Sequence, residues 1–204
     1  MVSRTLASSL ITAIRTFPAL ILTGPRQSGK TTLLKSLFSS SHSYVSLEEP
    51  DNQERARTDP RGFLNGLTMP VILDEIQYVP ELLSYIKSAI DDNRQPGQWL
   101  ITGSQNFTLM QGVSESLAGR SAVFSLLPLS VAEIVGKGDT SLPPEVWLDK
   151  FLQYVQINVL APGLTSLLLR GSYPEPATQS AVNRDMWCGS YITTYLERDV
   201  RNLK

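Results

Sequence analysis

One stretch of the sequence decides the fold: Leu22–Leu34, which reads LTGPRQSGKTTLL. Within it, Gly24–Thr31 fits the pattern G-x-x-x-x-G-K-[ST] without a mismatch. Its two glycines permit a tight turn whose backbone N–H groups converge on one point. A helix expected to begin near Lys30 adds the positive end of its dipole at the same place. The pattern therefore predicts a loop that binds phosphate groups.

The residues on both sides of this loop fit a strand before it and a helix after it. Ala19–Leu22 is a short apolar run that follows Pro18 and indicates a buried strand, and TTLLKSLF has helical spacing. In this Walker A context, Lys30 reaches the β- and γ-phosphates of a nucleoside triphosphate, and the Thr31 hydroxyl binds Mg²⁺. We expect ATP and Mg²⁺ as ligands. The predicted nucleotide-binding residues are Gly24, Pro25, Arg26, Gln27, Ser28, Gly29, Lys30, Thr31 and Thr32.

A second motif, Val71–Glu75, is an apolar run that ends in two carboxylates. In an open α/β fold, ligands bind at the carboxyl edge of the sheet, where a strand of this kind ends. This Walker B pattern predicts that Asp74 holds the Mg²⁺, usually through water. It also predicts that Glu75 orients and deprotonates the water that attacks the γ-phosphate.

A third apolar run, Leu100–Ser104, ends in small polar residues. Ser104 is a candidate for polarising the γ-phosphate or the attacking water, as a sensor residue does. Ser104 also fits the N-cap of a following helix, after a glycine turn. Both interpretations stay open at this point, and they are compatible with each other.

Apolar runs and helical segments alternate along the first two thirds of the chain, which predicts an α/β fold. Helical spacing occurs at Leu6–Ile14 and Glu81–Ile90. The expected architecture is a three-layer, mostly parallel sheet with helices on both faces. The predicted strands are Ala19–Leu22, Tyr44–Leu47, Val71–Leu73, Trp99–Thr102 and Ala122–Leu127.

The character of the sequence changes after Pro128. The letters LSVAEIV fit a helix, and Gly136–Pro144 is rich in turn-forming residues. We predict an ATPase domain over residues 1–136 and a helical segment over residues 137–204. Within that segment, helices are expected at Trp147–Val159, Gly163–Leu169 and Gln179–Asn202, with a turn at GSYPEP.

Composition excludes several classes of protein. With 42% hydrophobic and 18% charged residues, the chain belongs with folded globular proteins, and a net charge of −1 gives no global attraction to nucleic acid or anionic membranes. Cys188 and His42 are the only residues of their kinds, which argues against a disulfide and a Cys/His zinc site. No apolar run approaches the roughly 20 residues of a membrane helix. We expect a cytoplasmic protein.

With these motifs in place, the chain resembles the AAA-type P-loop ATPases, and more closely one prokaryotic family of ATP-binding proteins. In that family the P-loop domain precedes a separate C-terminal domain described as restriction-nuclease-like. The stretches that carry the resemblance are LTGPRQSGKTTLL, VILDEIQYVPELL, LITGSQNF, SLAGRSAVFSLLPLSVAEI, GSYPEP and YLERDVR.

The resemblance implies two further features. It gives Arg120 a role as the basic residue that completes a nucleotide site, and in AAA-type sites such an arginine often comes from a neighbouring subunit or domain. A homo-oligomer is therefore one expected assembly. It also implies more protein after Lys204, so we expect the chain to be a fragment that leads into a further C-terminal domain.

The predicted function is ATP hydrolysis with Mg²⁺ that drives a conformational switch acting on a partner protein or nucleic acid. The alternative is a non-catalytic module that senses nucleotide. A small-molecule kinase is disfavoured because the Asp74–Glu75 pair suits activation of water. A guanine-specific switch would show an N-K-x-D string, and a DEAD-type helicase would show an SAT-like motif and a second motor domain, none of which occurs in the sequence.

Overall fold

The computed structural model describes residues 2–104, 116–136 and 168–196. The chain forms two compact units, Arg4–Leu127 and a second unit that runs from Pro128 onward and includes the first three residues. The break between the units lies before the domain boundary predicted after residue 136. Because the residues that follow 136 lie outside the described ranges, that boundary stays a prediction.

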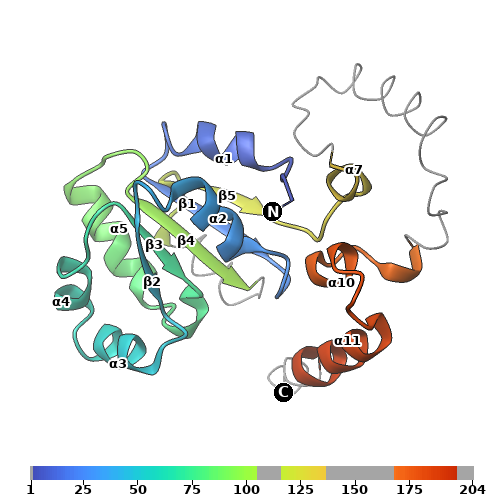
Figure 1. Cartoon of the computed structure of the whole chain (residues 1–204). Helices are drawn as coiled ribbons and strands as arrows, with labels where there is room; N and C mark the ends of the chain where they lie inside the picture. The colour runs from blue at the N-terminus through green and yellow to red at the C-terminus, as the bar shows by residue number, and fades with distance from the viewer. Residues whose placement is uncertain (1, 105–115, 137–167, 197–204) are drawn as a thin grey trace. The chain divides into compact units, whose positions relative to one another are not determined.

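A five-stranded sheet forms the centre of the first unit (Figure 1). The strand order is β2-β3-β4-β1-β5, and every neighbouring pair is parallel. This arrangement confirms the predicted parallel sheet. Its physical basis is that apolar runs of four to six residues are long enough only for buried strands. The strands are β1 (Ala19–Gly24), β2 (Ser43–Ser46), β3 (Val71–Asp74), β4 (Trp99–Ser104) and β5 (Ser121–Ser125).

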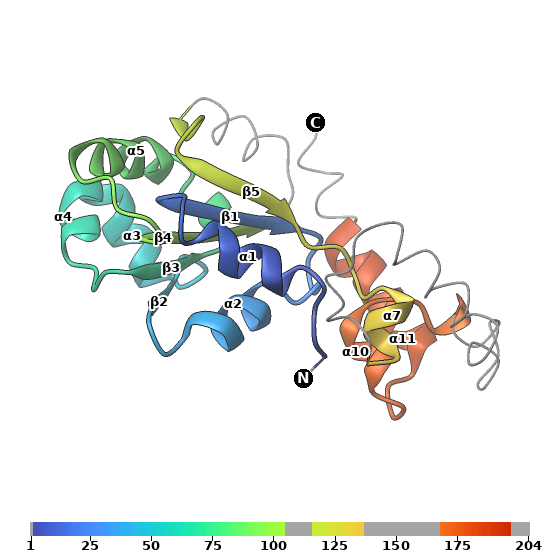
Figure 2. The ribbon, with the colours of Figure 1, turned by 90° about the horizontal axis from the view of Figure 1, so that it is seen from above.

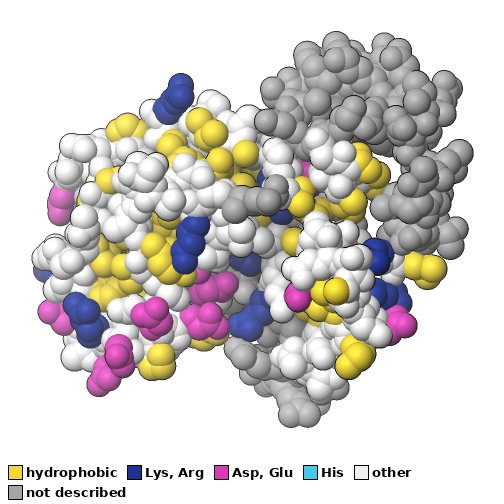
Figure 3. All heavy atoms as spheres, in the orientation of Figure 1, with side chains coloured by type: hydrophobic (Ala, Val, Ile, Leu, Met, Phe, Trp, Pro, Cys, Tyr) yellow, Lys and Arg dark blue, Asp and Glu magenta, His cyan; other side chains and the backbone are white. Residues whose placement is uncertain are grey.

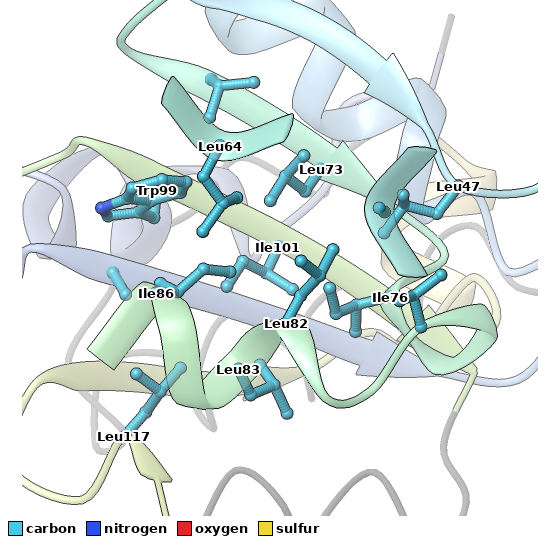
Figure 4. Packing of buried hydrophobic residues seen from close by; sticks show 14 of the residues in the cluster. Leu47, Leu64, Leu73, Ile76, Leu82, Leu83, Ile86, Trp99, Ile101 and Leu117 are labelled. Carbon is cyan, nitrogen blue, oxygen red and sulfur yellow. The ribbon is translucent and has the colours of Figure 1, made fainter. Parts of the chain in front are cut away.

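Helices cover both faces of the sheet, so the three-layer prediction is also confirmed (Figures 1 and 2). Successive strand residues alternate between the faces. In β1, Leu20 packs with the buried residues of α1 and α2, whereas Ile21 packs with those of α3, α4 and α5. Figure 4 shows the second cluster, with Leu82 of α5 beside Ile101 of β4. The helices are α1 (Ala7–Ala13), α2 (Lys30–Phe38), α3 (Pro50–Thr58), α4 (Pro60–Asn65) and α5 (Leu82–Asp92).

Helices α3 and α4 are absent from the sequence prediction, although each begins with a proline at its first position. Proline is well suited to this position because its fixed φ is helical and its missing N–H would have no intrahelical acceptor. The side chain of Asp59 caps α4 by accepting a hydrogen bond from the backbone N–H of Gly62. These two start signals mark helices that apolar spacing alone does not reveal.

The described part of the second unit includes α7 (Val131–Ile134), α10 (Pro174–Thr178) and α11 (Arg184–Tyr191), the last continuing as a π-helical segment to Leu196, and residues 168–170 are helical as well. A capping box between Ser130 and Glu133 begins α7. The predicted turn at GSYPEP is only partly found, because its last three residues form the first turn of α10. The prolines tolerate this, since the first N–H groups of a helix lack intrahelical acceptors. The helix predicted at Trp147–Val159, and most of that at Gly163–Leu169, lie outside the described residues.

Among the described residues, none of the helices has both the length and the apolar character that crossing a membrane requires.

Gly24 ends β1 in a conformation that excludes a side chain. Its φ is +146°, and a Cβ at this position would lie 2.3 Å from the carbonyl oxygen of Leu126. We therefore predict that Gly24→Ala destabilises the fold by at least about 1–3 kcal/mol. Gly66→Ala is the matched control, because the nearest atom would lie at an ordinary contact distance of 3.4 Å, and its effect should stay within about 0.5 kcal/mol. Thermal unfolding measures both, and equal melting temperatures for the two variants would contradict the prediction.

Candidate functional site

The phosphate loop connects the end of β1 at Gly24 to the start of α2 at Lys30. Within it, Gln27 (φ 59°) and Gly29 (φ 94°) have left-handed backbone conformations. Such alternation turns successive N–H groups toward the inside of the loop and makes a concave site for an anion. Gly29 is also the N-cap of α2, and it has no side chain that could occupy the first N–H groups of the helix. The loop and the helix dipole thus direct positive partial charge at one place.

Lys30 is buried at the base of this loop, with 4% of its surface exposed. Its Nζ donates hydrogen bonds to the carbonyl oxygens of Gly24 (3.1 Å) and Pro25 (3.0 Å). Burial lowers the pKa of Lys30, and the nearby carboxylates of Glu75 and Asp74 oppose that shift. The ammonium group is therefore held between the loop backbone and the two acidic residues.

Asp74 is the best-connected carboxylate of the site. Thr31 Oγ1 donates to both of its oxygens, at 2.9 Å from Oδ1 and 3.0 Å from Oδ2. The hydroxyl of Tyr44 donates to Oδ2 (2.8 Å), and the hydroxyl of Thr102 donates to Oδ1. The residues predicted to hold Mg²⁺, Thr31 and Asp74, are thus brought into direct contact.

Strand alternation explains why these side chains meet. Ile72 of β3 packs on the face that α1 and α2 cover, so Asp74, two residues further on, faces the same side as α2. Tyr44 pairs with Ile72 in the register of β2 and β3 and therefore shares that face. In β4, Leu100 belongs to this face, which places Thr102 there as well.

Tyr44 and Thr102 are functional candidates that the sequence prediction misses. The alternation of each strand indicates which residues share a face, but the pairing of β2 with β3 and of β3 with β4 is a property of the fold. Burial, together with the hydrogen bond to Asp74, raises the pKa of Tyr44 well above its usual value. Tyr44 therefore stays a neutral hydrogen-bond donor to this carboxylate.

Glu75 lies just past the end of β3 in a left-handed conformation, with φ 60° and ψ 51°. Its backbone N–H donates to Thr102 Oγ1 (3.1 Å). Its carboxylate oxygen Oε2 accepts hydrogen bonds from Gln77 Nε2 and, at 3.5 Å, from Ser104 Oγ. Ser104 in turn pairs with Gly24 in the register of β1 and β4. The three predicted motifs therefore meet at one edge of the sheet.

Ser28 contributes to the shape of the loop from within. Its side chain is fully buried, its N–H donates to the carbonyl oxygen of Pro25 (3.3 Å), and its own carbonyl accepts a hydrogen bond from Arg4 (2.9 Å). The guanidinium of Arg4, itself buried, also donates to the carbonyl oxygen of Leu127 (2.6 Å). The direct contact between Ser28 and nucleotide stays a prediction. Because the Ser28 side chain is buried, such a contact would involve its backbone.

The structure does not bring Arg120 to the loop of its own chain. Arg120 directly precedes β5, and its carbonyl accepts the N–H of Ala19 at the start of β1. It therefore lies where the parallel strands begin, whereas the phosphate loop lies where they end. At a rise of about 3.3 Å per residue, this edge is roughly 20 Å from the loop. The guanidinium makes two hydrogen bonds to Asp91, at 2.6 and 2.9 Å. A role for Arg120 at the nucleotide site of another subunit stays a prediction.

The oxygen ligands at this edge suit a hard divalent cation. Mg²⁺ is bound by one or two carboxylate or hydroxyl oxygens, with substrate phosphates and water completing the octahedron. Thr31 Oγ1 and the carboxylate of Asp74 are the residues that would hold it. Within the described ranges there is no cluster of three or more His, Cys, Asp or Glu that would indicate a different kind of metal site.

Taken together, a phosphate loop at the end of β1 and paired acidic residues at the end of β3 define the P-loop nucleoside triphosphatase fold. Residues 16–135 match the family described as AAA domain, and the chain belongs to that family.

Similar proteins come from bacteria and from an archaeon. Two uncharacterized proteins, one from Mycobacterium bovis and one from Mycobacterium tuberculosis, are each 32% identical over 203 residues, which is 98% of this chain. The chain spans only 40% of the length of these relatives. Among solved structures, the Walker-type ATPase PABY2304 of Pyrococcus abyssi is similar with a TM-score of 0.57 at 15% identity, covering 96% of this chain and 74% of that one. This last similarity bears on the fold alone.

Proposed function

We propose that the chain binds ATP with Mg²⁺ at the loop Gly24–Thr32 and hydrolyses it. The observation that carries this proposal is the contact of Thr31 Oγ1 with both oxygens of Asp74, beside a buried Lys30. It brings a phosphate loop, two oxygen ligands for a cation and the acidic Glu75 to one edge of the sheet. Membership of the AAA domain family supports the same conclusion.

Each residue has a separate part in the proposed reaction. Lys30 and the N–H groups at the start of α2 bind the phosphate oxygens. Thr31 Oγ1 and the Asp74 carboxylate would hold Mg²⁺, which would supply positive charge to neutralise the phosphates. Glu75 accepts a proton from water while the water oxygen bonds to the γ-phosphorus and the bond to the departing ADP oxygen breaks. Ser104, beside the loop, polarises the γ-phosphate or the water.

The work that hydrolysis drives is part of the proposal as well. We propose a conformational switch that acts on a partner protein or nucleic acid, in a homo-oligomer and in the cytoplasm. On the face in Figure 3, acidic and basic side chains are interspersed over the first unit, which favours a protein partner over a nucleic acid. The nuclease-like C-terminal domain that the family resemblance implies stays a prediction.

Replacing Lys30 with Ala removes the charge that meets the phosphates. We predict that ATP binding weakens by about 10- to 100-fold, because a hydrogen bond to a charged group contributes about 1.5–3 kcal/mol. Lys87→Ala, on α5 at the other face of the sheet, is the matched control and should bind like the parent. Titration with Mg-ATP decides the matter, and unchanged affinity in Lys30→Ala would mean that this loop does not hold the nucleotide.

Replacing Glu75 with Gln keeps the size of the side chain and removes the base. We predict that Mg-ATP still binds while single-turnover hydrolysis falls by about 10²- to 10⁴-fold. Glu81→Gln, a largely exposed glutamate, should hydrolyse at the parent rate. If Glu75→Gln hydrolyses ATP as fast as the parent, Glu75 is a structural residue and not the base. If the parent binds ATP without turnover, the non-catalytic sensing module is the correct description.

The position of Arg120 predicts a site shared between subunits. An arginine supplied to a P-loop site contributes about 10³- to 10⁵-fold in rate in other enzymes of this class. We predict that hydrolysis per subunit rises with protein concentration, and that mixing Arg120→Ala subunits with Lys30→Ala subunits restores activity that each lacks alone. Arg94→Ala, a nearby exposed arginine, is the control. A dilute monomer with full activity, unaffected by Arg120→Ala, would rule out the shared site.

A further inference from the structure

Gln77 connects the proposed base to the neighbouring strand. It lies in the short 3₁₀ helix Ile76–Tyr78 that follows Glu75. Its amide Nε2 donates to Glu75 Oε2, while its Oε1 accepts the backbone N–H of Ser104 at 3.1 Å. The amide of Gln77 therefore donates a hydrogen bond to the Glu75 carboxylate and accepts one from the backbone at the end of β4.

The backbone on both sides of Gln77 is fixed by the core. Ile76 and Val79 are fully buried in the cluster that α3, α4 and α5 cover. Glu75 has a left-handed conformation, which a residue other than glycine keeps only when its surroundings hold it there. Its N–H bond to Thr102 Oγ1 supplies one such restraint. The backbone thereby places the amide of Gln77, and the amide places the carboxylate.

The two oxygens of Glu75 are in different situations. Oε2 accepts hydrogen bonds from Gln77 and from Ser104 Oγ, whereas no described residue donates to Oε1. A general base needs one oxygen that is free to take a proton and a geometry that keeps it aimed at the water. Anchoring Oε2 meets the second requirement, and Oε1, to which no residue of the described ranges donates, meets the first.

We propose that Gln77 is a positioning residue for hydrolysis, which acts through Glu75 by holding Oε2 so that Oε1 faces the attacking water. This inference rests on the proposed ATPase function. The end of β4 takes part, because Ser104 holds the acceptor side of the same amide and lies beside Gly24 of the phosphate loop. The orientation of the base is thus tied to the strand next to the nucleotide.

Two substitutions separate the halves of this interaction. Gln77→Leu keeps the approximate size and removes both hydrogen bonds, whereas Gln77→Glu keeps an acceptor for the Ser104 N–H and loses the donor to Glu75. Misplacing a catalytic group by about 1 Å can cost about 10²-fold in rate. We expect kcat to fall by about 10- to 100-fold in both variants, with KM and Mg-ATP affinity unchanged. Gln53→Glu, which adds the same charge on α3, is the control.

The pH dependence of kcat gives a readout that a purely structural role would not move. In Gln77→Glu a second carboxylate adjoins Glu75, and two adjacent carboxylates resist ionising together. The acid limb of the pH–rate profile should therefore move to higher pH in Gln77→Glu, but not in Gln77→Leu or Gln53→Glu. An identical profile in all four proteins, the parent included, would overturn the proposed contact.

A double variant decides whether Gln77 acts through Glu75. Gln77→Leu combined with Glu75→Gln should hydrolyse ATP as slowly as Glu75→Gln alone, because groups that act as a unit are not additive. A double variant slower by the product of the two losses, or Gln77 variants at the parent rate while Glu75→Gln is slow, would overturn the role of Gln77 alone. If Glu75→Gln hydrolyses ATP as fast as the parent, the base role of Glu75 and this inference fail while the ATPase function stands. If the parent does not hydrolyse ATP, the proposed function and this inference both fail.

Discussion

The carboxylate of Asp74 is the group on which the arrangement of the site depends. Only 4% of the residue is exposed, and burying a carboxylate is costly unless hydrogen bonds compensate for the lost water. Hydroxyl groups from three separate elements supply those bonds: Thr31 from α2, Tyr44 from β2 and Thr102 from β4. The carboxylate therefore keeps the start of α2 against the ends of two strands, and the phosphate loop is held in register with the acidic pair.

The parallel sheet places different functional groups at the two ends of its strands. Because all of its strands run the same way, β1, β3 and β4 end at one edge, where Gly24, Asp74 and Ser104 lie. The other edge carries Arg120, engaged with Asp91. The phosphate loop and Arg120 are thus separated by the length of the strands. If Arg120 takes part in the proposed hydrolysis, this separation requires that it act at the nucleotide site of another copy of the chain.

The sequence suffices to locate the strands and the phosphate loop, but not the hydrogen bonds that complete the site. Short apolar runs such as Val71–Leu73 fit buried strands and are too short for helices. The sheet and its layers therefore follow from them. The roles of Tyr44 and Gln77 depend on strand order, on register and on the left-handed turn at Glu75, none of which has a local sequence signal. A long, flexible side chain could point to solvent in any of these places until the fold assigns it a partner.

The helices that sequence analysis missed have a related cause. Helices α3, α4 and α10 are short, and each begins with proline, a residue that breaks a helix anywhere beyond the first turn. In α10, the run of Pro174 and Pro176 signals a turn by composition, yet both residues occupy the first turn, where no N–H group is needed. Start signals at a helix N-terminus depend on position relative to the helix, and that position is known only once the neighbouring elements are packed.

Arg4 extends these constraints from the loop to the end of the first unit. One buried guanidinium donates to the carbonyl of Ser28 in the phosphate loop and to the carbonyl of Leu127, the last residue before the second unit begins. Separating the carbonyl of the buried Ser28 from it would leave a buried acceptor unsatisfied, at a cost of about 1–3 kcal/mol. A rearrangement of the loop and a displacement of the chain at Leu127 are therefore coupled through a shared donor.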